Sequence, residues 1–280
     1  MIPAPFDYLT PRTLAEATDM LAAHGEDAKI LAGGQSLLPM MKLRLARPKL
    51  LIDISKIPEL AGVRQEGDAI TLGALTTHHQ IESSELLRES CPLLPQTARL
   101  IGDVQVRNRG TIGGSLAHAD PAADLPAAVL ALRGEVRLCS AQGERWVGAD
   151  DFFLDIMTTT LRPGEVLTQV RVPVLSGRSG TAYLKARQKA SGFAIVGVAV
   201  WLKLDGSRVC EDIGVGITGV RAKPSRALGV EARLRGRRLE PTLIGEAAAG
   251  VTQEMDPFAD IHAAADFRAH LARLYTANAI

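Results

Sequence analysis

The chain has 280 residues, of which 46% are hydrophobic and 22% charged, and its formal net charge is +1. This length is enough for a sizeable core and predicts two domains. A nearly neutral chain without a basic tract gives no electrostatic reason to propose a nucleic acid partner. No apolar run is long enough to span a membrane, and residues 1–5 lack the charged and apolar regions of a signal peptide, so we expect a soluble, cytoplasmic protein.

The three cysteines, Cys91, Cys139 and Cys210, lie far apart in the sequence. None belongs to the closely spaced pairs that hold zinc or iron–sulfur clusters. We interpret them as buried thiols, because free cysteine usually packs as a small apolar side chain. The sequence therefore predicts that this chain has no metal site and no iron–sulfur cluster of its own.

The first predicted elements are a helix and a short strand that lead to a glycine-rich turn. Thr13 and Glu16 have the spacing of a capping box, and Gly25 is placed to end the helix. The apolar stretch 29–32 then predicts a strand that enters the turn Ala-Gly-Gly-Gln-Ser at 32–36. Rigid elements of this kind hold backbone donors still, as a phosphate site requires.

The middle of the chain predicts strands at 50–54 and 69–75, a helix that begins near His78 and another at 92–101. His78 and His79 are adjacent, and adjacent helical residues point in different directions. We therefore interpret the two histidines as capping or packing residues and not as a metal-binding pair. Beyond 101 the chain continues to a second glycine-rich turn.

This second turn, residues 111–115, has the same character as the first. Gly113 and Gly114 lack side chains, so the backbone can turn sharply there and a ligand can approach its N–H groups. Thr111 and Ser115 place hydroxyl groups on either side of the pair. The turn therefore predicts contacts with phosphate oxygens.

Polar residues follow the second turn. Asp120 and Asp124 lie around Pro121, a pattern that favours the start of a helix. A carboxylate at this point either accepts a hydrogen bond from a ribose hydroxyl or caps the helix. His118 lies three residues beyond the turn, and we interpret it as a hydrogen-bond partner and not as a general base.

The remaining elements are predicted from apolar runs and turn residues. A linker is expected at 173–180, where serine and glycine become frequent. Before the linker we expect a buried helix at 125–132, a hairpin of strands 135–139 and 144–147, and a strand at 166–172. After the linker we expect strands at 181–187, 193–201 and 213–218, and helices at 224–234, 242–255 and 263–277.

Two Gly-Gly-hydroxyl turns, each following an extended segment, can supply opposed backbone donors to one pyrophosphate. The alternative is that both are ordinary tight turns. Neither fits G-x-G-x-x-G or G-x-x-x-x-G-K-[ST], so the sequence does not favour a Rossmann or a P-loop site.

As a set, these motifs resemble the FAD-binding (medium) subunit of the molybdenum hydroxylases, of the carbon monoxide dehydrogenase medium-subunit type. The resemblance extends over nearly the whole chain. It rests on Phe6-Asp7-Tyr8, the run at 32–39, Leu-Ile-Asp-Ile at 51–54, Arg-Gly-Thr-Ile-Gly-Gly at 109–114, Asp-Pro-Ala-Ala-Asp at 120–124, Arg-Pro-Gly-Glu at 162–165 and the surroundings of Lys185.

The resemblance implies an α+β fold in two domains. Residues 1–175 would form an FAD-binding domain of two α/β subdomains, of the vanillyl-alcohol-oxidase-like type. Both strands at 50–54 and 69–75 would belong to its first half. Residues 176–280 would form a C-terminal domain of the carbon monoxide dehydrogenase flavoprotein type, with a small antiparallel sheet and covering helices.

The resemblance also implies a set of non-covalent FAD contacts, and no catalytic or metal-binding residue. The implied contacts are Leu31, Ala32, Gly33, Gly34, Gln35, Ser36, Leu37, Ile101, Thr111, Gly113, Gly114, Ser115, Asp124, Leu167 and Lys185. Lys185 would place its charge beside the N1–C2=O end of the flavin. Without the resemblance, Ile101 and Leu167 are core residues and Lys185 is an exposed strand lysine. Phe193 occupies a position that is often tyrosine in the family, and it keeps the stacking surface without the hydroxyl.

The function implied is that of a flavoprotein subunit in a heterotrimer. FAD on this chain would take electrons from [2Fe–2S] clusters on an iron–sulfur small subunit, while a molybdopterin large subunit oxidises the substrate. A dimer of heterotrimers is typical of many members. Two alternatives remain open, a stand-alone FAD-dependent oxidase or reductase and a scaffold without flavin. The substrate and the final electron acceptor are not determined by this sequence.

Overall fold

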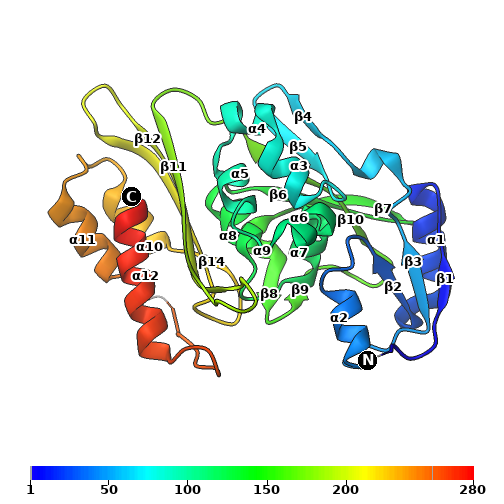
Figure 1. Cartoon of the computed structure of the whole chain (residues 1–280). Helices are drawn as coiled ribbons and strands as arrows, with labels where there is room; N and C mark the ends of the chain where they lie inside the picture. The colour runs from blue at the N-terminus through cyan, green and yellow to red at the C-terminus, as the bar shows by residue number, and fades with distance from the viewer. Residues whose placement is uncertain (1, 254) are drawn as a thin grey trace.

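The computed structural model describes residues 2–253 and 255–280. Three larger sheets follow one another across the molecule, in a mixed helix-and-sheet architecture (Figure 1). This arrangement confirms the predicted α+β class. Within the described residues, no helix is long and apolar enough to cross a membrane, and no group of three or more His, Cys, Asp or Glu side chains is placed to hold a metal ion.

The first sheet is parallel, with strand order β1-β3-β2. Helix α1 begins where the Thr13 hydroxyl accepts the N–H of Glu16, and it ends at Gly25, whose φ of 53° suits glycine. The chain then passes through β2 into the first glycine turn and a short helix. The elements are β1 (Asp7–Leu9), α1 (Leu14–His24), the 3₁₀ turn η1 (Gly25–Asp27), β2 (Ala28–Leu31), α2 (Leu37–Lys42), β3 (Leu50–Asp53) and η2 (Pro58–Leu60).

The second sheet is antiparallel, with strand order β4-β5-β10-β6-β7. Its strands are β4 (Val63–Glu66), β5 (Ala69–Gly73), β6 (Glu135–Ser140), β7 (Gly143–Gly148) and β10 (Val166–Pro173). The placement of β5 in the first half was wrong, because β5 pairs with β10, about a hundred residues further along the chain. Ile70 and Leu72 of β5 are fully buried, in the same core cluster as Val170 of β10.

Short helices cover the second sheet. They are α3 (His78–Ser83), α4 (Glu85–Ser90), α5 (Leu93–Ala98), α6 (Val104–Arg109), α7 (Ile112–His118), α8 (Asp124–Ala131) and α9 (Ala149–Phe152), followed by the small hairpin β8 (Phe153–Asp155) and β9 (Thr158–Thr159). The second glycine pair therefore lies in the first turn of a helix and follows another helix, whereas we expected a loop after an extended segment.

Helix α8 also begins later than the Pro121 pattern indicated. Asp120 closes a turn, since its Oδ1 accepts the N–H of Ala122 at 2.8 Å and its carbonyl accepts that of Ala123 at 3.0 Å. The first helical residue is Asp124. Residues 120–123 therefore form a turn, and the helix begins after it.

The third sheet is antiparallel, with strand order β11-β12-β13-β14, and it stands between helices on both faces (Figure 1). Helices α10, α11 and α12 lie on one side and α8 on the other. A Cβ on Gly216 of β13 would lie 1.9 Å from the carbonyl oxygen of Ala127, so glycine allows α8 to pack on this strand. The elements are β11 (Ser179–Arg187), β12 (Ala194–Leu204), β13 (Cys210–Thr218), β14 (Ser225–Arg226), α10 (Leu228–Leu234), α11 (Pro241–Ala249) and α12 (Ala265–Ala279).

Two of the predicted helices in this region were too long. The helix expected from residue 224 begins at Leu228, because Ser225 and Arg226 pair with β13 instead. The helix expected to run to residue 255 ends at Ala249, next to Gly250. The three cysteines are buried free thiols, as the sequence suggested.

Candidate functional site

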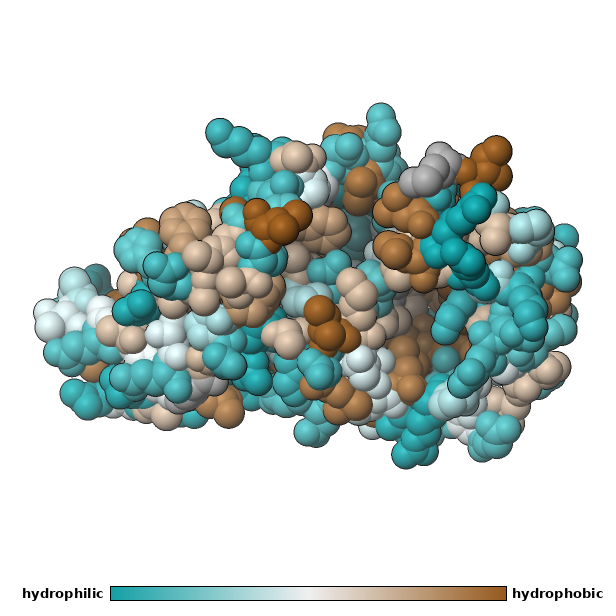
Figure 2. All heavy atoms as spheres, turned by 90° about the horizontal axis from the view of Figure 1, so that it is seen from below, coloured by the Kyte–Doolittle hydropathy of each residue, from teal (hydrophilic) through white to brown (hydrophobic). Residues whose placement is uncertain are grey.

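A cavity of about 740 Å³ lies where the first sheet, the helices of the second sheet and the β11–β12 connection meet. Its wall includes the turn after β2, the start of α7, the segment before β10 and the tip of the β11–β12 hairpin. The surface is hollowed on the face seen in Figure 2, where hydrophobic residues border the hollow. A concave, largely apolar cavity with a few polar groups is the usual form of a cofactor site.

The two glycine-rich segments meet at this cavity. A Cβ on Gly33 would lie 2.1 Å from the carbonyl oxygen of Arg109 and 2.9 Å from the Cα of Gly110. Only glycine permits the backbone of the first turn to approach the second segment so closely. Both segments line the same cavity. The structure therefore brings together two stretches that lie about eighty residues apart in the sequence.

The backbone N–H groups of the two segments differ in their partners. In the second segment, Ile112 donates to the carbonyl of Thr76 at 3.0 Å and Gly113 to that of Ala74 at 2.9 Å. The Gly114 N–H donates to the Thr111 hydroxyl at 3.1 Å. In the first segment, the N–H groups of residues 33–36 donate to no acceptor within the described part of the chain. Of the two segments, the first turn is therefore the one that offers free backbone donors to the cavity.

Fourteen of the fifteen residues predicted from the resemblance lie in the cavity wall. They are Leu31, Ala32, Gly33, Gly34, Gln35, Ser36, Leu37, Ile101, Thr111, Gly113, Gly114, Ser115, Asp124 and Leu167. The exception is Lys185. Its side chain is 2% exposed, and its ammonium group binds Asp124 Oδ2 at 2.8 Å and the carbonyl of Leu100 at 3.0 Å. Lys185 thus lies behind Asp124, and it is not the exposed strand lysine of the alternative interpretation.

Asp124 is the centre of a buried polar cluster. Each of its oxygens has a partner, because the Tyr183 hydroxyl donates to Oδ1 at 2.5 Å and Lys185 to Oδ2. Burial raises the pKa of Asp124 above its ordinary value, and the Lys185 ammonium and Tyr183 hydroxyl oppose that rise. Burial and the Asp124 charge raise the pKa of Tyr183 as well. The cluster joins β11 to the first residue of α8, and so connects the third sheet to the cavity.

Sequence reasoning treated His78 only as a packing or capping residue, but the structure also places it in the cavity wall. Its ring packs against Gly110, where an added Cβ would lie 2.7 Å from Nε2. Burial, with the nearby Arg107 guanidinium, lowers the pKa of His78 to about 4. His78 is therefore neutral at physiological pH. Its neighbour His79 is exposed, so the two histidines have different surroundings.

The opposite wall is formed by residues 161–167 and by the tip of the β11–β12 hairpin. Arg145 fixes the turn before β10, since its guanidinium binds both oxygens of Glu165 at 2.7 and 2.8 Å and donates to the carbonyl of Thr160. This pair lowers the pKa of Glu165. Phe193 lies at the cavity with 48% of its surface exposed.

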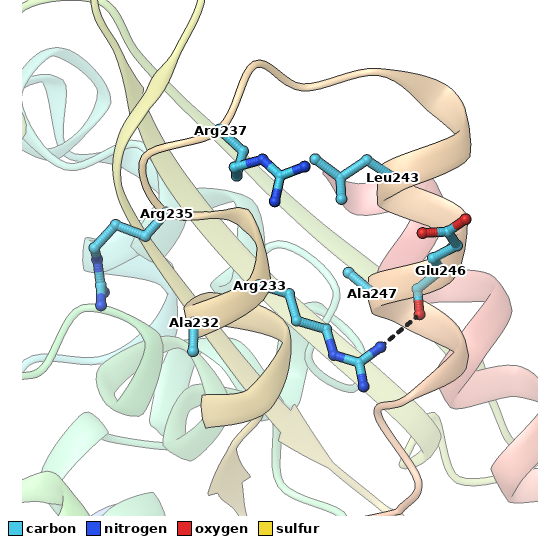
Figure 3. A pocket seen from close by; sticks show the side chains of 7 residues that line it. All are labelled: Ala232, Arg233, Arg235, Arg237, Leu243, Glu246 and Ala247. Atoms are coloured by element: carbon cyan, nitrogen blue, oxygen red, sulfur yellow. Dashed lines mark hydrogen bonds between the residues drawn. The ribbon is translucent and has the colours of Figure 1, made fainter.

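A second, smaller cavity of about 380 Å³ lies between α10 and α11 (Figure 3). Arg233 and Arg237 point into it, whereas Arg235 points away. Arg233 donates to the carbonyl of Glu246 at 3.4 Å, and Arg235 binds Asp212. All three arginines are exposed. The cavity contains none of the predicted site residues.

The larger cavity combines the kinds of group that a dinucleotide cofactor needs. It offers unpaired N–H groups on a glycine turn, hydroxyls on the facing helix, and apolar walls at Ile101 and Leu167. A cavity of this kind, in a mixed helix-and-sheet domain followed by a small antiparallel sheet, is typical of a protein that binds a dinucleotide cofactor.

Comparisons with known proteins identify the family. Residues 4–175 match the FAD binding domain in molybdopterin dehydrogenase, and residues 181–280 match the CO dehydrogenase flavoprotein C-terminal domain. The chain belongs to this family of FAD-binding medium subunits of molybdenum-containing dehydrogenases, which are oxidoreductases. The resemblance drawn from the sequence motifs is confirmed.

Individual relatives agree over the full length. The carbon monoxide dehydrogenase medium chain of Hydrogenophaga pseudoflava is 41% identical over 97% of this chain and 94% of its own. The glyceraldehyde dehydrogenase medium chain of Sulfolobus acidocaldarius is 39% identical over 100% of this chain and 98% of its own. A solved carbon monoxide dehydrogenase from Hydrogenophaga pseudoflava superposes with a TM-score of 0.97 at 40% identity, covering 100% of this chain and 97% of that chain.

Proposed function

We propose that this chain is the FAD-binding subunit of a heterotrimeric molybdenum hydroxylase. In that role it takes electrons from [2Fe–2S] clusters on an iron–sulfur small subunit and passes them to an external acceptor. A large subunit with molybdopterin oxidises the substrate. The observation that carries the proposal is the junction of the two glycine segments, where the backbone at Gly33 meets that of Arg109 and Gly110 on one cavity.

Relatives with other substrates support an assembly of several chains. They include a nicotine 6-hydroxylase medium subunit and a caffeine dehydrogenase subunit beta. We propose a dimer of heterotrimers in the cytoplasm, and a division of this chain into an FAD-binding domain at 1–175 and a C-terminal domain at 176–280. The fifteen residues implied by the resemblance are proposed as the FAD site, with Lys185 acting from behind Asp124.

The residues of this chain bind and orient the cofactor. The unpaired N–H groups at 33–36 and the Ser115 hydroxyl would hold the diphosphate. The Asp124 carboxylate has lone pairs left for a ribose hydroxyl, because each oxygen accepts only one bond within the protein. Ile101 and Leu167, which line the cavity, would keep water from the flavin ring. When bound, FAD supplies the ability to accept single electrons and to deliver two.

The test is to purify the full chain from its native host and to analyse what accompanies it. We expect a yellow protein that releases FAD on denaturation, together with two further chains that carry molybdenum and iron–sulfur absorbance. A chain that purifies alone with FAD and oxidises a substrate would support a solitary oxidase or reductase instead. A colourless chain that binds no added FAD would refute a flavoprotein of either kind and favour a scaffold.

Placement of the site is tested by Gly114→Leu. A Cβ on Gly114 meets only the Thr111 hydroxyl, at 2.9 Å, and Ala32, at 4.0 Å, so a larger side chain would fill the space between the two segments. We expect FAD content to fall to roughly a tenth while partner assembly persists. Gly245→Leu is the matched control, since nothing lies within 4 Å of its added Cβ. Unchanged FAD content in Gly114→Leu would refute this placement.

A further inference from the structure

The turn at 100–102, between α5 and α6, is held by two cations that come from different parts of the chain. Arg107 of α6 donates from Nη1 to the carbonyl of Ile101 at 3.1 Å. Lys185 of β11 donates from Nζ to the carbonyl of Leu100 at 3.0 Å. Two consecutive carbonyls are thus bound by charged donors, one from the second sheet's helices and one from the third sheet.

Each cation is itself fixed by a carboxylate. Arg107 binds Glu82 of α3 at 2.8 Å from Nε, with 15% and 25% of the two side chains exposed. Lys185 binds Asp124, with 2% and 5% exposed. Hydrogen bonds from ionised donors are stronger than neutral ones, and the rigid fork of arginine suits a residue that binds two acceptors at once. The carbonyls are therefore held by groups that have little freedom to move.

The turn forms part of the cavity wall. Ile101 and Gly102 both line it, and the φ of 48° at Gly102 gives the sharp change of direction. The tip of the β11–β12 hairpin packs on the same turn, since a Cβ on Gly192 would lie 3.4 Å from the Cα of Gly102. A shift of this turn would therefore move the wall and release the hairpin tip that carries Phe193.

We propose that Arg107 is a positioning residue for the cofactor cavity, which clamps the turn at 100–102 together with Lys185. The proposal rests on the proposed FAD site. Arg107 does not line the cavity and acts through the Ile101 carbonyl. Lys185 acts in the same way through the Leu100 carbonyl, in addition to its contact with Asp124. The two side chains are coupled, because they hold neighbouring atoms of one turn.

The experiment measures the FAD dissociation constant of the deflavinated full chain by quenching of flavin fluorescence. Arg107→Leu is made together with Glu82→Gln, so that no partly buried carboxylate is left without its cation. We expect Glu82→Gln alone to stay within about twofold of wild type, and the pair to bind FAD about tenfold more weakly. Arg107→Lys should recover part of this loss. Arg99→Leu removes an exposed arginine beside the same turn and is the matched control, with no change expected.

Coupling distinguishes a clamp from separate structural effects. Lys185→Met also leaves the buried Asp124 without its cation, so it should weaken FAD binding by about tenfold or more. Adding it to the Glu82→Gln, Arg107→Leu double variant should weaken binding by clearly less than the product of the two effects. Wild-type FAD affinity in the Glu82→Gln, Arg107→Leu double variant would overturn the clamp. A triple variant whose loss of affinity equals the product of the two separate losses would overturn it as well. The unfolding midpoint without FAD is recorded for each variant, so that affinity is assigned to folded protein. A wild-type chain that binds no FAD would instead overturn the proposed function.

Discussion

The first glycine turn, residues 33–36, and the second glycine segment, residues 112–115, border the same cavity but use their backbone in different ways. The N–H groups of the first turn are unpaired within the described residues. Those of the second segment are taken by the carbonyls of Ala74 and Thr76 and by Thr111. One segment therefore offers donors, while the other forms a fixed wall against which they are placed.

The difference arises from what precedes each segment. The first follows the parallel strand β2 and leads into α2, so its N–H groups meet neither a neighbouring strand nor a preceding helical turn. The second begins helix α7, and its early N–H groups would be unsatisfied without the chain that follows β5. Two stretches with the same Gly-Gly-x-Ser or Gly-Gly-Ser character thus have separate tasks, which a motif alone does not distinguish.

The largest effect is expected where the two segments touch. Gly33→Ala would place a Cβ 2.1 Å from the Arg109 carbonyl oxygen, so the backbones must separate. We expect a loss of about 3 kcal/mol of unfolding free energy, together with loss of bound FAD. Urea unfolding measures the first and flavin absorbance the second. Gly148→Ala has nothing within 4 Å of its added Cβ and should behave as wild type. A stable, yellow Gly33→Ala protein would mean that the junction is not needed.

The next effect concerns the support behind the second segment. His78 packs against Gly110, and its pKa is lowered from 6.5 to about 4. Its contribution to stability is therefore present above pH 6.5 and is lost as the pH falls towards 4. The difference of about 2.5 pH units, at about 1.4 kcal/mol each, gives about 3 kcal/mol over this range. His78→Leu should unfold with a shallower pH dependence between pH 6.5 and 4.

The exposed neighbour provides the control for this prediction. His79→Gln removes a histidine from the same helix turn and should leave the pH dependence of unfolding as in wild type. If His78→Leu and wild type lose the same unfolding free energy between pH 6.5 and 4, the titration of His78 is not the cause. Chemical denaturation at closely spaced pH values measures the difference directly.

Local sequence signals predicted those parts of the fold that depend on local chemistry. The Thr13 cap, the end of α1 at Gly25 and the hairpin of β6 and β7 involve residues close together in the chain. The strand at 69–73 was predicted, but its assignment to the first half of the FAD-binding domain was wrong, because its partner β10 is distant in sequence and nothing in residues 69–73 indicates that pairing. Residues 225–226 were similarly predicted as the start of a helix, because their pairing with β13 is not visible in the local sequence.

In the candidate site, too, features set by local sequence were predicted and features set by contacts between distant residues were not. The glycine segments were visible as motifs, and the resemblance supplied Ile101, Leu167 and Asp124. Arg107 was missed, because its importance comes from Glu82 and the Ile101 carbonyl, and no motif includes these three residues. The location of Lys185 behind Asp124 depends on packing between β11 and α8, which sequence spacing does not reveal.

A smaller effect is expected at the cap of the second segment. Thr111→Ala removes the hydroxyl that accepts the Gly114 N–H at 3.1 Å and leaves a helix donor without a partner. We expect a loss of about 1 kcal/mol in unfolding free energy, and a modest loss of FAD affinity, because the wall becomes less rigid. Thr111→Ser keeps the hydroxyl and should restore most of both. Equal stability of the alanine variant and wild type would show that the cap is dispensable.

The smallest expected effect concerns the serine hydroxyls, and it distinguishes binding by side chains from binding by the backbone. Within the described residues, neither the Ser115 nor the Ser36 hydroxyl makes a hydrogen bond, and both residues line the cavity. If the second segment contributes side chains and the first contributes backbone, Ser115→Ala should weaken FAD binding about fivefold, with Ser36→Ala nearer to wild type. Neither change should alter the unfolding midpoint. Fluorescence titration of the two deflavinated variants side by side gives the ratio, and a larger loss from Ser36→Ala would mean that the first turn also binds through its hydroxyl.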